Sequence, residues 1–298
     1  PAAALEIVRV QTRRRTPPMM TNQHIALKQC RHGSFMYNLN DRMIGAALDC
    51  YGEWCEGELA LLAPLLRPGR VVVDVGAYIG THTVFFAKKV APGGHVYAIE
   101  PQRHPFQLLC GNVALNALTN VTCIPGMAAA EAGERRIAVH SPTVVHNFGN
   151  NRALEVPKGE TVRVIRIDDL DLPRCNLIKI DVEGMESEVL AGAHLSIERF
   201  RPVIYCENST VTNSAATINA MREIGYCAWW HISSYFNPDN FFKEKENIFA
   251  RFVPEANMLC TPPEAKIVVE GLTAVEGPED DWKKALGRLG RPVVVVSS

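Results

Sequence analysis

The sequence predicts an α/β fold built on a doubly wound, mostly parallel sheet, and three observations lead to this prediction. Residues 71–75 read Val-Val-Val-Asp-Val, a run typical of a strand buried on both faces of a parallel sheet. A turn that contains glycines follows, and then a segment of helical periodicity. The same order of apolar strand and helix recurs over residues 95–117 and 177–193. Strands that alternate with helices at this spacing indicate βαβ units.

The length and hydrophobic content suit one large core with small added units, because the chain has 298 residues and is 47% hydrophobic. We expect residues 1–20 to be a disordered leader and residues 21–69 to form a hairpin and helix that cap the sheet. Residues 70–262 should form the main domain, and residues 263–298 a C-terminal extension. Within the cap, weak alternation over residues 34–51, broken at Asn40-Asp41, predicts the hairpin, and leucines at helical spacing over residues 59–66 predict the helix.

Composition gives no reason to expect nucleic acid or a membrane as a partner. The formal net charge is −1, so there is no overall basic field. No stretch is long and apolar enough to span a bilayer, and we expect no signal peptide because no apolar h-region is seen. The nine cysteines include no Cys-x-x-Cys pair, which indicates a reducing compartment and no structural zinc. We therefore expect a cytoplasmic protein, and a homo-oligomer remains open.

The turn after the first strand of the domain has the form Asp-x-Gly-x-x-x-Gly. Its glycines stand where the chain must reverse and let a ligand approach the backbone. A helix that begins near Thr81 would offer free N–H groups to a carboxylate or phosphate. The strand at residues 95–99 ends in Glu100, which is placed to accept hydrogen bonds from both ribose hydroxyls of an adenosine. The residues expected to hold the cofactor lie in this turn and at the following strand ends: Asp74, Gly76, Ala77, Tyr78, Gly80, Thr81, His82, Glu100, Pro101, Met127 and Asp181.

Two cofactors compete for such a turn. The dinucleotide fingerprint requires Gly-x-Gly-x-x-Gly, and the position of its middle glycine is occupied here by Tyr78. The Asp-x-Gly-x-x-x-Gly turn together with Glu100-Pro101 favours S-adenosylmethionine over NAD.

The alternation breaks over residues 131–168. Residues 135–139 and 161–167 resemble two strands of an inserted β-hairpin, separated by a long polar loop. Loops of this length inside a compact domain tend to be functional or disordered. The loop carries His146, which is a candidate base or substrate contact; an exposed histidine without a role is the alternative.

A second informative stretch starts with the apolar strand at residues 177–180 and continues as Asp-Val-Glu-Gly. Alternation places Asp181 and Glu183 on the same side of the extended exit, where Gly184 allows the turn. Ligands of open α/β sheets bind beyond the carboxyl ends of the strands, so we expect these carboxylates to converge with Glu100 on one crevice. Both are candidate catalytic residues, although Glu183 is also placed to cap the next helix.

Two routes to an activated hydroxyl remain open. One uses a general base, with Asp181, Glu183 or His146 as the candidates. The other uses a divalent metal such as Mg²⁺, because Glu207 and Asn208 close the strand at residues 202–206 and would join Asp181 in an oxygen-rich trio. Further strands are expected near residues 226–230 and 257–260.

Over roughly residues 33–262 the chain resembles the FkbM family of methyltransferases. The motifs that carry the resemblance are Asp74-Val-Gly76-Ala-Tyr-Ile-Gly80, Glu100-Pro101 and Asp181-Val-Glu183-Gly184. The resemblance implies a Rossmann-like class I methyltransferase fold with a seven-stranded sheet whose last strand is antiparallel. It also implies S-adenosylmethionine-dependent methylation of a hydroxyl on a small metabolite or sugar. Where many relatives have Gly-Asp after the third strand, this chain has Ala128-Ala129-Ala130-Glu131. The alternatives are an NAD-dependent oxidoreductase and a non-catalytic module that binds the cofactor.

Overall fold

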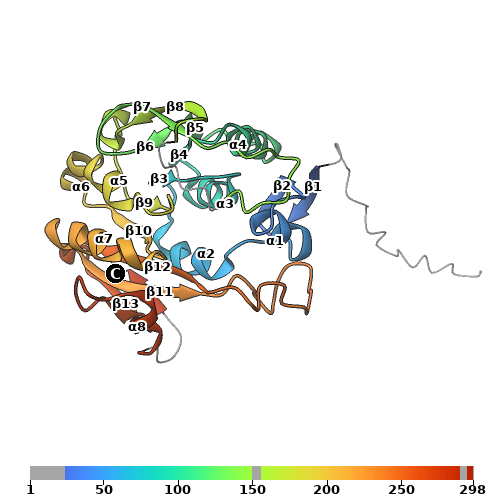
Figure 1. Ribbon diagram of the computed structural model, residues 1–298. Coiled ribbons are helices and arrows are strands. Elements are labelled where there is room, and N and C mark those ends of the chain that lie inside the picture. The colour runs from blue at the N-terminus through green and yellow to red at the C-terminus, as the bar shows by residue number, and fades with distance from the viewer. Residues whose placement is uncertain (1–23, 150–155, 289–293, 298) are drawn as a thin grey trace, which may run out of the picture.

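A mixed sheet of eight strands forms the centre of the molecule (Figure 1). The computed structural model describes residues 24–149, 156–288 and 294–297, and the expected leader lies outside them. The strand order is β14-β11-β12-β10-β9-β3-β4-β5. In this order the strands span Thr273–Ala274, Cys227–Ser233, Glu255–Thr261, Val203–Glu207, Leu177–Ile180, Val71–Val75, His95–Glu100 and Val121–Pro125.

The sheet has the expected direction pattern. Strands β5, β4, β3, β9 and β10 pair in parallel, and β12 pairs antiparallel with both β10 and β11. The prediction of a mostly parallel, doubly wound sheet with an antiparallel last strand is therefore confirmed. The two-residue strand β14, which belongs to the C-terminal extension, adds an eighth strand beside β11.

Helices cover both faces of the sheet, because strand residues alternate between two hydrophobic cores. On one face Val73, Ile178 and Ile204 pack with α5, α6, α7 and α8. On the other face Val72 and Tyr205 pack with α2 and α3. The helices span α1 Ile44–Cys50, α2 Glu56–Leu62, α3 Thr81–Val90, α4 Arg103–Leu115, α5 Glu186–Ala191, α6 His194–Phe200, α7 Val211–Glu223 and α8 Trp282–Leu286.

The N-terminal hairpin exists, but its predicted placement is wrong. Strands β1 (Ile25–Cys30) and β2 (Gly33–Asn38) form it, whereas most of the second predicted arm is helix α1. Asp41 explains the error. Its carboxylate accepts hydrogen bonds from the backbone N–H groups of Met43 and Gly45 at 3.0 and 2.9 Å, so Asn40-Asp41 leads into a helix and does not reverse a hairpin.

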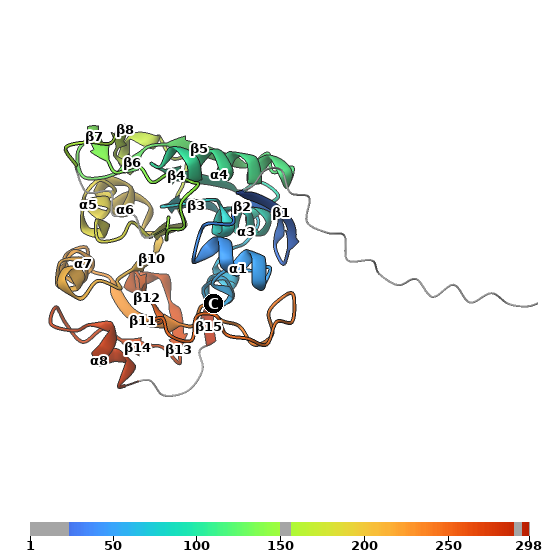
Figure 2. The same ribbon diagram turned by 45° about the vertical axis from the view of Figure 1, so that its right-hand side comes forward.

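The inserted hairpin is confirmed. Strand β7 (Gly133–Ile137) pairs antiparallel with β8 (Glu160–Ile165), and β6 (Met127–Ala128) joins β8 in parallel. The middle of the connecting loop, residues 150–155, lies outside the described residues. Figures 1 and 2 both show this small sheet beside β5, at the edge of the molecule farthest from β11.

The C-terminal extension is joined to the main sheet through β14 and also forms a two-stranded sheet of its own. Strand β13 (Ile267–Glu270) pairs antiparallel with β15 (Val294–Ser297). Asp280 accepts a hydrogen bond at 3.0 Å from the indole N–H of Trp230, which is buried in β11. Three single 3-10 turns complete the elements: Ala63–Leu65, Ile167–Leu170 and Pro263–Ala265. Within the described part of the chain, no helix has both the length and the apolarity that a bilayer crossing requires.

Candidate functional site

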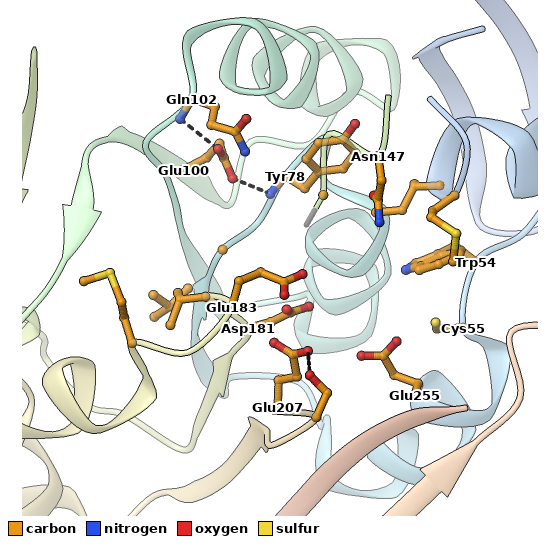
Figure 3. A pocket seen from close by; sticks show the side chains of 18 of the residues that line it. Trp54, Cys55, Tyr78, Glu100, Gln102, Asn147, Asp181, Glu183, Glu207 and Glu255 are labelled. Atoms are coloured by element: carbon orange, nitrogen blue, oxygen red, sulfur yellow. Dashed lines mark hydrogen bonds between the residues drawn. The ribbon is translucent and has the colours of Figure 1, made fainter. Parts of the chain in front are cut away.

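A pocket opens at the carboxyl ends of β3, β4, β9 and β10, the edge at which open α/β sheets bind ligands (Figure 3). Its walls come from segments far apart in sequence: the turn after β3, the turn after β9, the N-terminal unit around Trp54, and the segment that leads into β12. Ten of its lining side chains are labelled in Figure 3: Trp54, Cys55, Tyr78, Glu100, Gln102, Asn147, Asp181, Glu183, Glu207 and Glu255.

The glycine turn after β3 is fixed by backbone hydrogen bonds. Gly76 has a φ of +76°, a conformation that favours glycine, and its N–H donates to the carbonyl of Ile99 at 3.0 Å. Ala77 N–H donates to the same carbonyl at 3.0 Å. The backbone of this turn is therefore held against the end of β4, and Gly76 lines the pocket.

Glu100 closes β4 and is held by the backbone on both of its oxygens (Figure 3). Oε2 accepts the N–H of Tyr78 at 2.9 Å and Oε1 accepts the N–H of Gln102 at 2.8 Å. Each carboxylate oxygen can still accept another hydrogen bond. The side chain is only 3% exposed, and this burial raises the pKa of Glu100 to about 7. Glu100 thus presents two oriented acceptors to a ligand that carries a pair of hydroxyls.

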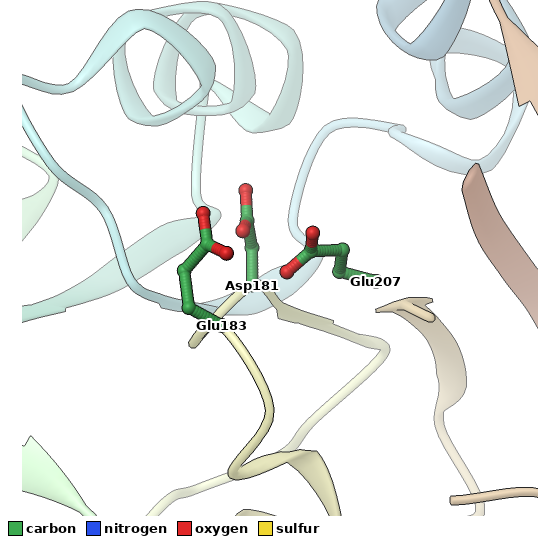
Figure 4. A group of neighbouring side chains, drawn as sticks. All are labelled: Asp181, Glu183 and Glu207. Carbon is green, nitrogen blue, oxygen red and sulfur yellow. The ribbon is translucent and has the colours of Figure 1, made fainter. Parts of the chain in front are cut away.

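Three carboxylates converge at the other end of the pocket, where β9 and β10 end (Figure 4). One oxygen from each of Asp181, Glu183 and Glu207 lies within 4.8 Å of the others. The expectation that Asp181 and Glu183 face the same side is confirmed. The backbone reaches this arrangement by a turn and not by an extended exit, since β9 ends at residue 180 and Glu183 has a φ of +58°.

Lys179 supplies positive charge beneath this group. It is 3% exposed, and its Nζ lies 3.0 Å from Asp181 Oδ2 and 3.9 Å from Asp74 Oδ1. Burial raises the pKa of Asp181, but Lys179, with smaller contributions from His82 and Glu207, outweighs burial, so the pKa lies below its ordinary value. Burial, together with repulsion from Asp181 and Glu183, raises the pKa of Glu207 well above its ordinary value.

About half of the predicted cofactor contacts line the pocket, and the rest do not. Those that do are Gly76, Tyr78, Glu100, Pro101, Met127 and Asp181. Five of the predicted contacts are not among the described residues that line the pocket: Asp74, Ala77, Gly80, Thr81 and His82. Asp74 is fully buried beneath the turn, where Thr83 Oγ1 donates to it at 2.6 Å.

His82 is buried on α3, and its Nε2 lies 3.0 Å from Glu58 Oε2. Burial lowers the pKa of His82 to about 3, so the ring is neutral at physiological pH. The tautomer that places the proton on Nε2 donates to the Glu58 carboxylate. In this structure His82 contacts Glu58 and does not line the pocket.

Two predicted catalytic or metal residues also lie outside the pocket lining. His146 forms an isolated bridge with Asp41, and its ring stacks on His140 with the centroids 4.0 Å apart. Asn208 is buried, and its side-chain N–H group donates to Ser214 Oγ at 3.1 Å. The structure thus corrects the expected metal trio, because Glu183 and not Asn208 lies beside Asp181 and Glu207.

The sequence analysis missed two carboxylates of the pocket wall, Glu58 and Glu255. Glu58 lies on α2, and besides His82 it contacts Asn257, whose Nδ2 donates to Oε1 at 3.0 Å. Burial raises the pKa of Glu58 to about 7 and that of Glu255 to about 8. No local motif marks either residue, since each reaches the pocket only through the packing of distant segments.

The family model for the methyltransferase FkbM domain matches residues 74–227. The chain is 28% identical over 160 residues to the hexuronic acid methyltransferase AglP of Haloferax volcanii, a match that covers 52% of this chain and 62% of that protein. It is 32% identical over 161 residues to the 31-O-demethyl-FK506 methyltransferase FkbM of Streptomyces tacrolimicus, covering 43% of this chain and 60% of that protein. These matches thus span about three fifths of the length of each curated relative.

Among solved structures, the chain resembles a methyltransferase FkbM from Methylobacillus flagellatus at 18% identity and a TM-score of 0.41, covering 64% of this chain and 43% of that one. It also resembles TYW2 of M. jannaschii in complex with AdoMet, at 16% identity and a TM-score of 0.45, covering 81% of this chain and 87% of that one.

Proposed function

The chain belongs to the FkbM methyltransferase family, and from this premise we propose that it is an S-adenosylmethionine-dependent O-methyltransferase acting on a hydroxyl of a small metabolite or sugar. The observation that carries the proposal is the arrangement around Glu100. A carboxylate with two backbone-oriented oxygens lies at the end of β4, next to a glycine turn that lets a ligand approach the backbone. A ribose diol is the ligand that such a carboxylate suits.

The residues present fit S-adenosylmethionine. Glu100 and Gln102 would hold the ribose end, Met127 would pack against the adenine, and Gly76 would allow the methionine part to lie against the turn. The absence of a glycine at Tyr78 argues against a dinucleotide, whose pyrophosphate needs the close approach that the middle glycine of its fingerprint gives. When bound, the sulfonium cofactor supplies an activated methyl group.

In the proposed reaction the acceptor oxygen forms a bond to the methyl carbon while the bond between carbon and sulfur breaks. The sulfur keeps that electron pair and becomes a neutral thioether, and the hydroxyl proton passes to a carboxylate of the pocket. Asp181 and Glu183, which lie beside each other at the end of β9, are the candidates for this base. The protein mainly has to align the two reacting atoms and exclude water.

The chemistry of the relatives and of the pocket supports the proposed acceptor class. One relative is named for a hexuronic acid and the other for a hydroxyl of FK506. Trp54 and Tyr235, whose rings stack with centroids 5.2 Å apart, form an apolar surface beside the carboxylates. An apolar ring face next to hydrogen-bond acceptors suits a ring compound with several hydroxyls.

Calorimetric titration with S-adenosylhomocysteine and, separately, with NADH tests the cofactor. We expect binding of S-adenosylhomocysteine that EDTA does not change, and no binding of NADH. Transfer of labelled methyl from S-adenosylmethionine to a panel of uronic acids, neutral sugars and macrolide alcohols then tests the reaction. Tight binding of NADH without a response to S-adenosylhomocysteine would indicate an oxidoreductase. Cofactor binding without transfer to any hydroxyl compound would indicate a non-catalytic module.

A further inference from the structure

We propose that Asp181, Glu183 and Glu207 bind a hard divalent cation such as Mg²⁺. Carboxylate oxygens are the ligands that Mg²⁺, Mn²⁺ and Ca²⁺ prefer. Figure 4 shows the three side chains pointing toward one shared space, and their ligand oxygens lie within 4.8 Å of one another. Oxygens on opposite sides of such a cation lie about 4 to 5 Å apart. The observed separation therefore fits a cation placed between the three carboxylates.

A second observation at Glu207 points independently to a ligand. Glu207 is 5% exposed, and Ser209 Oγ donates to its Oε1 at 2.6 Å. Its other oxygen, Oε2, is buried and has no hydrogen-bond donor among the residues that the structure describes. A buried carboxylate oxygen without a donor costs free energy unless a cation or proton satisfies it. A bound cation at this group would satisfy it.

With all three carboxylates ionised, this end of the pocket carries an excess of negative charge. Lys179 is the cation that the described residues bring to this group, and it is shared between Asp181 and the buried Asp74. Lys179 contacts Asp181 through Oδ2, at 3.0 Å. Glu207 takes part in no ion pair within the described residues. A divalent cation would offset the negative charge that Lys179 leaves unbalanced.

The use of this site rests on the proposed function. A metal beside the acceptor would coordinate the hydroxyl that receives the methyl group, lower the pKa of that hydroxyl and fix its oxygen in place. Removal of the proton would then need no strong base. Cation binding itself requires no methyl transfer, so the site can be tested on the protein alone.

The test measures binding of Mn²⁺ to the full chain by electron paramagnetic resonance, with Mg²⁺ and Ca²⁺ as competitors. We expect saturable binding at one site, displaced by Mg²⁺. E207Q and E183Q, which keep the size of the side chain and remove a charged ligand, should each weaken Mn²⁺ binding at least about tenfold. E255Q is the matched control, because Glu255 lines the same pocket but does not belong to the trio. It should bind Mn²⁺ nearly as the unaltered protein does.

Absence of saturable Mn²⁺ binding, or equal binding by E207Q, E183Q and E255Q, would overturn the proposal. Because Glu207 is buried and its variant could unfold, E183Q at a half-buried position provides a second test, and far-UV circular dichroism checks both folds. Titration with S-adenosylhomocysteine in EDTA separates this result from the proposed function. A protein that binds S-adenosylhomocysteine but not Mn²⁺ keeps its methyltransferase assignment and loses the metal site.

Discussion

Gly76 lies directly against the backbone carbonyl of Asp181, so close that a Cβ atom at Gly76 would overlap that carbonyl oxygen. The turn after β3 and the acidic turn after β9 are thus in backbone contact, although Gly76 and Asp181 are 105 positions apart in the chain. Together they form one floor of the pocket. Because Gly76 has no side chain, the turn after β3 can lie this close to Asp181, a candidate catalytic residue.

The substitution G76A should damage both stability and cofactor binding. Alanine would occupy a left-handed conformation, which costs about 1 to 2 kcal/mol, and its Cβ would force two backbone segments apart. We expect a loss of about 3 kcal/mol or more in the free energy of unfolding, measured by urea denaturation. Binding of S-adenosylhomocysteine should fall with it.

G69A is the matched control for this prediction. Gly69 has a φ of +84°, and a Cβ built there meets nothing within 4 Å, so the variant carries the conformational strain without the overlap. We expect a loss of about 1 to 2 kcal/mol and unchanged cofactor affinity. Equal losses in the two variants would show that the contact between Gly76 and Asp181 has no energetic weight.

The raised pKa of Glu100 should make the affinity for the proposed cofactor depend on pH. Ribose hydroxyls donate hydrogen bonds to the carboxylate form, and the pKa of Glu100 is raised from 4.5 to about 7 by burial. Below about pH 7 the ligand must therefore displace a proton, and affinity for S-adenosylhomocysteine should fall up to about tenfold for each pH unit. Above that pH the affinity should level off. Calorimetric titration between pH 5 and 8.5 measures the dependence, since these limits lie about two units below and about one and a half units above the pKa.

The variant E100Q identifies the source of this dependence. An amide cannot offer both oxygens to the ribose, so affinity should drop about 10- to 100-fold at high pH, in line with the loss of charge-assisted hydrogen bonds. The pH dependence near 7 should vanish. The same shift also bears on stability: because the folded pKa lies above the unfolded value, Glu100 favours folding at low pH, and this contribution is lost as the pH rises through about 7. If the pH dependence persisted in E100Q, its source would be Glu58 or Glu255 and not Glu100.

The main sheet could be predicted from the sequence because local patterns of residues mark each of its main strands. The apolar runs of β3 and β9 are buried on both faces, and such strands carry no polar alternation that could be misread. The N-terminal hairpin was misplaced because its turn at Arg31-His32 contains no typical turn residue, whereas Asn40-Asp41 imitates one while capping α1.

The candidate site was harder to predict, because a motif shows how residues are spaced along the chain but not where their side chains point. Asp74 and Glu100 both stand at the end region of a strand, yet Asp74 is buried against Lys179 and only Glu100 reaches the pocket. The partner of Asp74 comes from β9, about a hundred residues later in the chain, and no local pattern reveals it. The same reason applies to Glu58, which enters the wall through the packing of α2 on the strands.

Lys179 should be essential for stability, because it is the buried cation between Asp74 and Asp181. The variant K179M keeps the aliphatic length and removes the charge. It leaves Asp74, which is fully buried, with one donor from Thr83 and no cation. Removing one partner of a buried ion pair costs about 3 to 5 kcal/mol, and we expect a loss in that range by urea denaturation at neutral pH.

R135M serves as the comparison for K179M. Arg135 pairs with Glu188 at 2.7 Å, but both side chains are about one third exposed or more, at 31% and 41%. An exposed pair of this kind contributes about 1 kcal/mol or less. A loss in K179M no larger than that in R135M would mean that the buried carboxylates tolerate being unpaired, for instance by taking up a proton.

Asn112 on α4 should determine whether the N-terminal hairpin stays attached to the domain. Its side chain is fully buried; Oδ1 accepts the N–H of Met36 at 2.7 Å, and Nδ2 donates to the carbonyls of Met36 and Ile79 at 3.0 and 2.8 Å. The variant N112D has nearly the same shape but cannot donate, so a carboxylate would face two carbonyl oxygens. We expect a loss of about 2 to 4 kcal/mol, together with faster amide exchange over residues 25–38.

N120D separates attachment of the hairpin from a general loss of stability. Asn120 also donates two hydrogen bonds to backbone carbonyls, those of Ala87 and Gly94, but it makes none to the hairpin. N120D should lower the free energy of unfolding of the whole domain. The amide protection of β1 and β2 should then fall by the same factor as that of the rest of the molecule. In N112D the hairpin should exchange faster than the sheet. Uniform exchange in N112D would mean that the hairpin unfolds only with the whole domain, since other contacts, such as those of Asn116 with Ser34, would then be sufficient to hold it.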